Sequence, residues 1–453
     1  MRGIHTQGIT TGESVKETKQ ARKVPQQWEW TEPSVWTERM LTTLEKGVKG
    51  GVWFSLIDKI FSKRNLYSSF RKVKKGRGKS GIDHITIQKF ETQLDYNIAK
   101  IHAAIKNNTY KPQKILRIEI PKPGTKKKRP LGLPTVRDKV VQTSLRNVIE
   151  PIFEQIFSTC SFGFRPGLSC KDALREVDKL LKEGFQYVVD ADIKSYFDNI
   201  NQTGLMTEIK EKISDSRVLG LIEKFLKQEI ISEMRNWIPE KGTPQGGVIS
   251  PLLSNIYLNK FDHKMVNKGY NLVRYADDFV ILCKSKTEAE NALKETTTWI
   301  NAHDLELHAD KTKIADLTIP GEGFDFLGYR FSRTKGKEIL KHWPSKKSEK
   351  KCRANIRQYT KRCNGRSLNE IIAIINPILR GWFQYYRHSP LATMKTMDGW
   401  VRMRLRSILR KRRNGKGRGR GHDHNRWPNN FFAERGLFSL NATLQDVCQS
   451  SRR

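Results

Sequence analysis

The tetrapeptide Tyr275-Ala276-Asp277-Asp278 constrains the fold of this chain more than any other feature, because it places two adjacent carboxylates between two apolar runs. Residues 272–273 before it and residues 279–282 after it are apolar. This pattern is typical of a strand, a tight turn and a second strand, with both acids at the turn. Adjacent carboxylates repel one another, so we expect a cation to be held there.

The composition indicates a partner of opposite charge. The chain has 453 residues with 84 Lys and Arg against 47 Asp and Glu, which gives a net charge of +37. Nucleic acid is the commonest polyanion that such a protein binds, and no amphipathic segment favours an anionic membrane instead. The length predicts two to four domains, and a hydrophobic content of 37% excludes a wholly disordered basic protein.

Cysteine usage and targeting signals are consistent with an intracellular protein. The six cysteines include no C-x-x-C pair, so zinc is unsupported and reduced thiols are expected. His422-Asp423-His424 has no cysteine nearby, which favours a solvated polar linker over a metal site. No apolar run is long enough to span a bilayer, and the N-terminus lacks the apolar core of a secretion signal.

The pattern along the chain alternates helices with strands and hairpins, which indicates an α+β catalytic core. Residues 1–45 read as a polar, loosely organised extension that docks through its tryptophans, and residues 334–350 read as a linker. We expect helices within 46–115, at 136–158, within 203–235, after 247, at 286–302 and within 351–410. We expect strands at 115–120 and 187–193 and from about 305 to 331, a hairpin with a basic tip at 121–129, and a flexible segment at 414–421.

Asp192 is the natural third partner of the acidic pair, because it ends an apolar strand that an antiparallel sheet can place beside the hairpin turn. A lone acidic pair is more often a solvated turn. Three carboxylates, however, can hold two Mg²⁺ ions about 4 Å apart, which suits in-line displacement at phosphorus. One ion would activate a primer 3′-hydroxyl, and the other would neutralise the triphosphate and the departing pyrophosphate.

These residues carry a family resemblance. Residues 275–278 resemble the Y-x-D-D box of reverse transcriptases, and residues 190–200 resemble their first palm motif in its group II intron form. The ordered set of motifs covers roughly residues 65–335. Four further segments are similar to the same family: residues 161–167, 242–253, 305–312 and 326–330.

The resemblance continues beyond this region. Residues 376–386 look like the thumb, or maturase, segment of group II intron-encoded proteins. Residues 426–432 and 436–440 are similar to the C-terminal segment of bacterial members that lack an endonuclease. An HNH nuclease would need clustered histidines and paired cysteines after the basic segment. The residues that follow this segment do not contain that set, so we expect no cleavage of a second DNA strand. The resemblance implies a bacterial cytoplasm or nucleoid as the location.

The resemblance implies roles for the carboxylates. Asp192, Asp277 and Asp278 would be the catalytic residues and ligands of two Mg²⁺ ions, with Mn²⁺ as a substitute, and the backbone carbonyl of Ile193 would assist. Asp190 lies on the same strand face as Asp192, so spacing alone does not separate the two, and only the family pattern favours Asp192.

Further residues match positions around the nucleotide. Phe197 matches an aromatic gate whose ring would clash with a ribose 2′-hydroxyl. The alternative is an aromatic ring that only packs in the core. Lys122 and Arg129 match cations that grip the triphosphate from a mobile hairpin. Gln245 matches a residue that lines the nucleotide site, next to glycines that permit close backbone approach. Lys311 matches a proposed general acid for pyrophosphate departure, and an ammonium group that merely neutralises charge stays equally open.

The C-terminal third is helical and basic, and we expect it to bind nucleic acid. Residues 382–386 include four aromatic side chains, which suit either RNA stacking or a helical core. Ten basic residues and no acidic one lie between Arg402 and Arg420, a run that predicts salt-dependent binding. The candidate nucleic-acid-binding residues are Arg380, Arg387, Arg402, Arg404, Arg406, Arg410, Lys411, Arg412 and Arg413.

We therefore predict a right-hand polymerase fold with four parts. Residues 1–45 form the N-terminal extension, and residues 46–335 form fingers and palm. Residues 336–410 form an α-helical thumb, or maturase domain, and residues 411–453 form a small basic DNA-binding segment. The sequence does not determine the oligomeric state.

The predicted function is an RNA-directed DNA polymerase encoded by a group II intron. It would extend a DNA primer on an RNA template with dNTPs, bind the intron RNA to promote splicing, and act on target DNA by target-primed reverse transcription. No membrane partner is expected. Two alternatives stay open: a stand-alone reverse transcriptase for defence or DNA repair, and a splicing-only maturase without polymerase activity.

Overall fold

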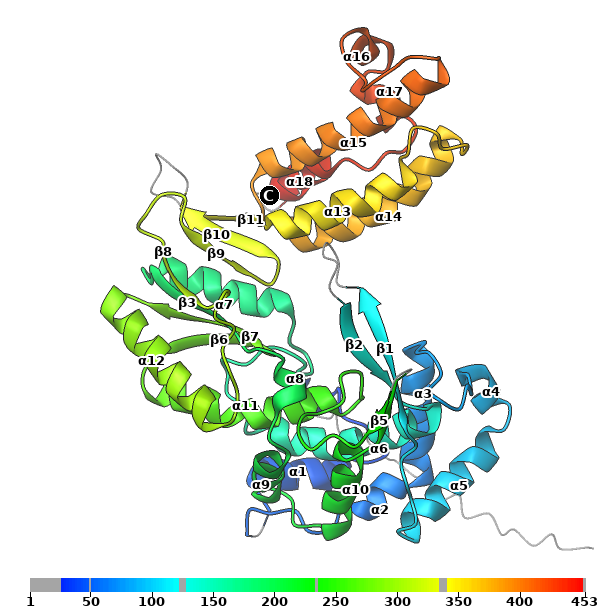
Figure 1. Ribbon diagram of the computed structural model, residues 1–453, viewed down its shortest axis with the longest axis vertical. Coiled ribbons are helices and arrows are strands. Elements are labelled where there is room, and N and C mark those ends of the chain that lie inside the picture. The colour runs from blue at the N-terminus through cyan, green and yellow to red at the C-terminus, as the bar shows by residue number, and fades with distance from the viewer. Residues whose placement is uncertain (1–25, 49, 122–127, 233–234, 334–339, 451–453) are drawn as a thin grey trace, which may run out of the picture.

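The computed structural model describes residues 26–48, 50–121, 128–232, 235–333 and 340–450. The described elements are spread along one long axis (Figure 1). N-terminal helices lie at one end, a mixed sheet with its covering helices lies in the middle, and C-terminal helices lie at the other end. The predicted mixture of helices and strands is confirmed.

The N-terminal helices pack around α6 (Val136–Glu154), which is buried along most of its length. A helix that is buried on most sides forms the centre of a core rather than its cover. The segment at residues 28–44 is also part of this core. Within it, Trp36 is 2% exposed, and its indole donates to the Asn147 carbonyl in α6 at 2.9 Å. The other elements here are η1 (Gln26–Trp28), α1 (Glu38–Lys46), α2 (Ile57–Phe61), α3 (Lys63–Lys75), α4 (Ile87–Glu91) and α5 (Leu94–Lys106).

A small sheet with the order β2-β1-β4-β5 adjoins these helices. β1 (Ile115–Pro121) and β2 (Lys128–Leu133) form the predicted antiparallel hairpin, whose tip at 122–127 lies outside the described residues. The helical prediction for 203–235 is wrong at its end. After α9 (Gln202–Lys210) and α10 (Ser216–Leu226), the chain forms β4 (Ile230–Ile231) and β5 (Asn236–Trp237), because the β-branched pair in β4 extends the edge of β1 in parallel.

The central sheet has the order β6-β7-β3-β8 and is covered on both faces. On one face, Phe279 and Ile281 pack with α11 and α12; on the other, Val280 and Leu282 pack with α7 and with the small sheet β9-β10-β11. This alternation follows the two-residue period of a strand. The elements are α7 (Cys170–Lys182), β3 (Tyr187–Asp192), α8 (Tyr196–Asn199), α11 (Ser250–Asn267), β6 (Asn271–Tyr275), β7 (Asp278–Cys283), α12 (Lys286–Ala302), β8 (Lys313–Asp316), β9 (Gly323–Phe326), β10 (Tyr329–Arg333) and β11 (Leu340–Pro344).

The C-terminal helices share one core with the second face of the central sheet, and their elements correct two predicted boundaries. The linker predicted at 334–350 is wrong over its described part, because β11 pairs with β10 and α13 begins at Lys346. The predicted division at residue 410 falls inside α15, and Phe432 and Leu440 pack in the same core as Leu405. The elements are α13 (Lys346–Tyr359), α14 (Leu368–Tyr386), α15 (Leu391–Arg412), α16 (His422–Arg426), α17 (Asn429–Ala433) and α18 (Leu440–Ser450).

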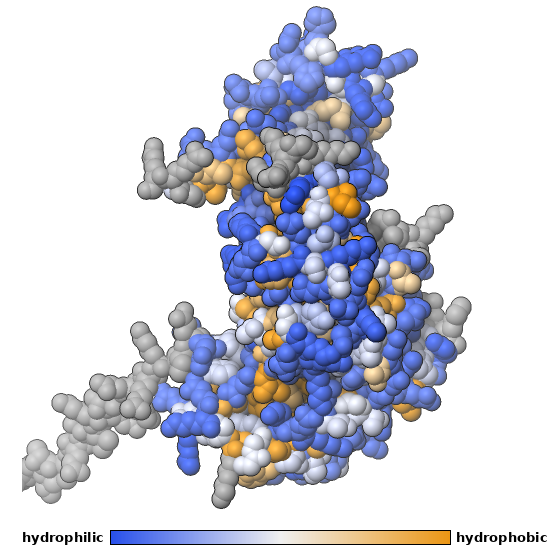
Figure 2. Space-filling model, turned by 90° about the vertical axis from the view of Figure 1, so that its left-hand side faces the viewer, coloured by the Kyte–Doolittle hydropathy of each residue, from blue (hydrophilic) through white to orange (hydrophobic). Residues whose placement is uncertain are grey.

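The surface reflects the basic composition. Figure 2 shows a mostly hydrophilic face in which apolar residues form only small patches. Among the described residues, no helix combines the length and the apolar character that crossing a bilayer requires.

Because Trp36 is buried and bonded to α6, Trp36→Ala should lower the free energy of unfolding of the N-terminal helices by about 3–5 kcal/mol. Urea unfolding followed by circular dichroism measures this change. Trp30→Ala is the matched control, because Trp30 is only partly buried and, within the described residues, its indole donates to the nearby Gln27 carbonyl. Equal and small effects of both changes would contradict the inclusion of this segment in the core.

Candidate active site at the carboxylate turn

The two acidic segments meet at one end of the central sheet. Asp192, the last residue of β3, lies directly opposite Asp278, the first residue of β7. Tyr275 pairs with Asp278, so Ala276 and Asp277 form a two-residue turn between β6 and β7. The prediction that Asp192 lies beside the hairpin turn is confirmed. Like charges on directly opposite strand positions destabilise a sheet, so this arrangement calls for a compensating cation.

The pKa values report this crowding. The pKa of Asp278 is raised to about 7, first by burial and then by the negative charges of its neighbours Asp190, Asp192 and Asp277. Burial likewise raises the pKa of Asp277, and the charge of Asp192 adds to the shift. A cation brought to this turn would therefore remove an unfavourable concentration of negative charge.

Lys311 supplies part of that compensation. Its ammonium group bonds to Asp192 Oδ2. Lys311 lies four residues after Leu307, which forms an isolated β-bridge with Ile193, the residue that follows β3. The amide of His308 also donates to the Asp192 carbonyl at 2.8 Å. In the described part of the chain, no three carboxylate, imidazole or thiol groups already surround one point as metal ligands. Asp192 would have to exchange Lys311 for a metal ion to complete such a site.

Arg274, which the sequence did not single out, holds the turn in place. Its side chain is fully buried in β6, and its guanidinium donates to both carboxylate oxygens of Asp262 in α11. The same group donates to the Ala276 carbonyl at 2.8 Å, and it also bonds Ser161 and Asn255. The sequence did contain a signal for this role, because Arg274 is a charged residue within an apolar strand. A buried guanidinium needs a partner for nearly every donor, so such a residue predicts an internal network.

The segment 161–164 packs against the turn from outside the sheet. A side chain at Gly163 would place its Cβ 2.2 Å from the Ala276 amide nitrogen, so only glycine fits there. Asn255 donates to the Gly163 carbonyl at 2.8 Å and thereby links this segment to the Arg274 network. Ala276 has a φ of 61°, a left-handed conformation that costs a non-glycine residue roughly 1 kcal/mol or more and needs such support.

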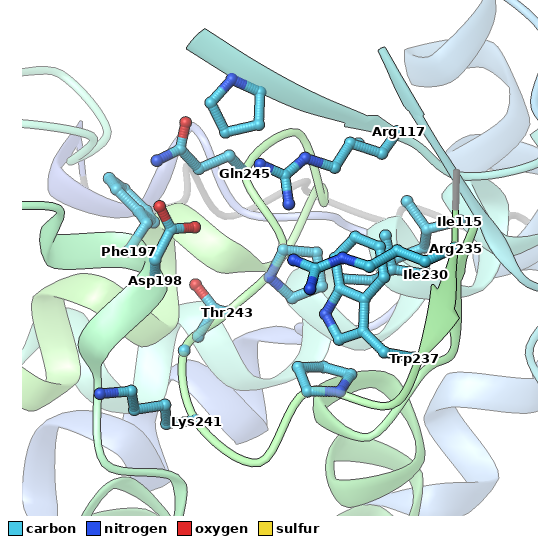
Figure 3. Close-up of a pocket in the computed structure, with 15 residues that line it drawn as sticks. Ile115, Arg117, Phe197, Asp198, Ile230, Arg235, Trp237, Lys241, Thr243 and Gln245 are labelled. Atoms are coloured by element: carbon cyan, nitrogen blue, oxygen red, sulfur yellow. The ribbon is translucent and has the colours of Figure 1, made fainter. Parts of the chain in front are cut away.

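A cavity of about 290 Å³ lies between β1, β5 and the residues that follow β3, and the aspartates of the turn are not among its lining residues. Phe197 and Gln245, both predicted to contact a nucleotide, line it together (Figure 3). Asp198 and Thr243 lie on the same side as Phe197, while Arg117 and Arg235 reach in from the opposite side.

The remaining predicted nucleotide contacts are less close to this cavity. Arg129 is exposed on β2, opposite Ile120 of β1, and it does not line the cavity. Lys122 lies outside the described residues.

Asp190 lies opposite Lys313 of β8, and burial raises its pKa to about 6. Asp190 pairs with Val280, two residues along β7 from Asp278, whereas Asp192 pairs with Asp278 itself. The register therefore distinguishes Asp190 from Asp192.

The structure corrects one predicted nucleic-acid contact. Arg406 is 3% exposed, and its guanidinium donates to the Trp427 carbonyl and to Asn429. It therefore joins α15 to the segment before α17 and is closed off from an external phosphate. Arg410 also has an internal role, because it bonds the buried carboxylate of Asp423 at 2.7 Å, so the segment at 422–424 is folded onto α15.

The other predicted contacts remain accessible to differing degrees. Arg404 is half-buried and bonds Thr360, whereas Arg380 is exposed and lies over the ring of Phe438. The rest lie on or just beyond α14 and α15, partly buried at the first two positions and exposed at the last three: Arg387, Arg402, Lys411, Arg412 and Arg413.

Comparisons with known proteins match two regions. Residues 120–331 match a family of reverse transcriptases (RNA-dependent DNA polymerases), and residues 349–427 match the maturase-specific domain of group II introns. The chain is 29% identical to group II intron-encoded protein LtrA of Lactococcus lactis over 77% of its own length, and it spans 64% of the length of LtrA.

Two further matches cover smaller parts of the chain. It is 32% identical to protein YkfC of Escherichia coli K12 over 58% of this chain and 78% of YkfC. A solved structure, a partial Cas6-RT-Cas1--Cas2 complex, is 26% identical over 55% of this chain and 42% of that chain, with a TM-score of 0.36.

The Arg274–Asp262 pair generates a stability prediction. Arg274→Met or Asp262→Leu alone should each lower the free energy of unfolding by about 3–5 kcal/mol, because each leaves one buried charge without its partner. The double variant should recover most of this loss, as measured by urea unfolding.

The double variant also separates the fold from the turn. It lacks the donor to the Ala276 carbonyl, so its binding of Mn²⁺, measured by electron paramagnetic resonance, should remain weaker than that of the unmodified chain. Full recovery of Mn²⁺ binding would mean that Arg274 stabilises the fold without positioning the turn.

Proposed function

The chain belongs to the family of group II intron-encoded reverse transcriptases and maturases, and we propose that it is an RNA-directed DNA polymerase. It would extend a DNA primer on an RNA template with dNTPs. The observation that carries this proposal is the meeting of Asp192 with Asp278, with Asp277 at the adjacent turn. Carboxylates gathered at one point can hold the two metal ions that suit in-line displacement at phosphorus.

The residues at the turn fit a pair of Mg²⁺ ions, with Mn²⁺ as a substitute. Asp192, Asp277 and Asp278 offer only oxygen donors, which hard divalent cations prefer. Burial and then the charges of neighbouring carboxylates raise the pKa of Asp278, and a bound cation would offset both effects. The carbonyl of Ile193 would complete the ligand set. When bound, such ions lower the pKa of a primer hydroxyl and neutralise phosphate charge.

The protein's own groups would position the substrates. Lys311, released from Asp192, would lie near the phosphates of the nucleotide, where it would donate a proton or neutralise charge. Phe197 would exclude a ribose 2′-hydroxyl, and Gln245 would line the same nucleotide site. Lys122 and Arg129 of the β1–β2 hairpin would hold the triphosphate.

The parts of the chain would then have separate tasks. The central sheet would be the palm, and the N-terminal helices with the β1–β2 hairpin would be the fingers. Helices α13 to α15 would be the thumb, and the basic residues after Lys411 would contact target DNA. The thumb would then begin with α13 rather than at residue 336, and it would end with α15 rather than at residue 410.

The maturase-specific match at 349–427 favours a second task, the binding of intron RNA during splicing. Arg380, Arg387 and Lys411 would contact phosphates there. The ribonucleoprotein would insert the intron by target-primed reverse transcription. This match argues against a stand-alone enzyme for defence or repair, and the complete set of aspartates argues against a maturase without polymerase activity.

The polymerase proposal predicts that Asp277→Asn abolishes Mg²⁺-dependent extension of oligo(dT) on poly(rA), by at least about 1000-fold. The substitution keeps the size of the side chain but removes a negative charge from the turn. Binding of the intron RNA, measured by filter retention, should stay within about twofold. Loss of both properties together would show that Asp277 supports the fold instead. No extension by the unmodified chain would overturn the polymerase proposal itself.

The gate proposal predicts that Phe197→Ala relaxes sugar selection by roughly tenfold or more, because a clash is removed rather than a contact. The measurement is the ratio of kcat/KM for dNTP and rNTP. Phe164→Ala is the control, because Phe164 lies 6.4 Å from the Phe197 ring but does not line the cavity. An unchanged ratio in the Phe197 variant would assign this ring to packing.

A further inference from the structure

The cavity beside Phe197 contains a cationic side that none of the assigned roles uses. Arg117 comes from β1 and Arg235 from β5, and both line the cavity (Figure 3). With Lys241 they face a single carboxylate, Asp198, so the charged groups of the lining leave an excess of positive charge. Burial raises the pKa of Asp198, and Arg117 opposes that shift, which indicates that the two groups interact.

The Arg235 guanidinium has unused hydrogen-bonding capacity. Its contact within the described part of the chain is with the ring of Trp237, 4.6 Å from the centroid, and no hydrogen bond or ion pair of its side chain accompanies it there. Arg117 lies 5.4 Å from the same ring and 3.5 Å from Glu119 Oε1. Stacking on an aromatic ring orients a guanidinium while leaving its edge donors free.

Thr243 provides a second, independent observation. Its side chain is 3% exposed, and its hydroxyl has no hydrogen-bond partner among the described residues. A buried hydroxyl without a partner costs about 1–3 kcal/mol, and an acceptor on a ligand in the cavity would remove this cost. Figure 3 shows this hydroxyl directed into the cavity, between Asp198 and the arginines.

We propose that Arg117, Arg235 and Thr243 form a polyphosphate subsite that binds a diphosphate or triphosphate anion. Guanidinium groups bind phosphate oxygens through paired hydrogen bonds, and the hydroxyl donates one more. The cavity of about 290 Å³ suits a compact anion better than a stretch of polynucleotide.

The subsite rests on the proposed polymerase function, because that function supplies two sources of this anion. One is the phosphate tail of an incoming dNTP, and the other is the pyrophosphate released after incorporation. Both share the same chemistry. The subsite differs from the cations proposed on the β1–β2 hairpin, because Arg129 does not line the cavity.

The direct test is calorimetric titration of the full chain with inorganic pyrophosphate in the absence of divalent metal. Arg235→Gln should weaken binding by about tenfold or more, since it removes a charged donor. Thr243→Val should weaken binding by about threefold to tenfold while leaving the unfolding temperature unchanged or higher, because it removes an unpartnered buried hydroxyl. Lys210→Gln, an exposed change on α9 away from the cavity, should bind like the unmodified chain.

Competing sites give distinguishable results. Pyrophosphate binding that is lost in Arg129→Gln and unchanged in Arg235→Gln and Thr243→Val would overturn the subsite. So would a loss of single-stranded DNA binding in Arg235→Gln with pyrophosphate affinity unchanged, because the groove would then hold a polynucleotide.

Steady-state kinetics separate the two sources of the anion. A higher inhibition constant for pyrophosphate with an unchanged KM for dNTP assigns the subsite to the departing product, and a higher KM assigns it to the incoming nucleotide. Failure of the proposed function is read separately, as absent primer extension by the unmodified chain, because the calorimetric test needs no synthesis.

Discussion

The buried bond between Arg274 and Asp262 is the interaction on which the rest of the site depends. It fixes a strand to a helix, and the remaining donors of the same guanidinium reach the turn carbonyl and the segment at 161–163. A buried ion pair seldom adds net stability compared with apolar residues of similar size. What it adds here is geometry: Ala276 is held in a left-handed conformation that an unsupported turn would leave. The adjacent aspartates are therefore presented in one arrangement.

Much of this arrangement follows from local sequence. The helix at 286–302 and the hairpin at 275–278 were predictable because their periodicity and capping residues act within a few positions, as Ser285 does by accepting from the Glu288 amide. The meeting of Asp192 with Asp278 was predictable because an acid that ends one strand lies opposite an acid that begins another when the two strands pair in antiparallel register. The two-residue strands β4 and β5 were not, because their stability comes from the edge of β1, more than 100 residues away.

The arginines show where such prediction stops. Arg404, Arg406 and Arg410 occupy one basic run, yet the guanidinium of Arg406 closes onto the Trp427 carbonyl and that of Arg410 onto Asp423. Composition predicts that a run of this charge meets nucleic acid, but it cannot say which side chains are used inside the fold. The helical phase does not decide it either, since the partners arrive from a segment that returns across α15 only after Gly421. Folding thus divides one run into internal ties and external contacts.

The same principle connects the two unsatisfied features of the candidate site. At the turn, burial and then the negative charges of neighbouring carboxylates raise the pKa of Asp278 to about 7. In the cavity beside Phe197, the Arg235 guanidinium and the Thr243 hydroxyl have no acceptor among the described residues. The carboxylates of the turn and the arginines of the cavity have other contacts within the protein. The Lys311 ammonium bonds Asp192, and the carboxylate that faces the arginines is Asp198. The proposed ligand, a nucleotide with its divalent cation, would supply both complements at once, the metal for the carboxylates and the phosphates for the guanidinium groups. The uneven distribution of charge among these side chains is therefore of the kind that such a ligand would balance.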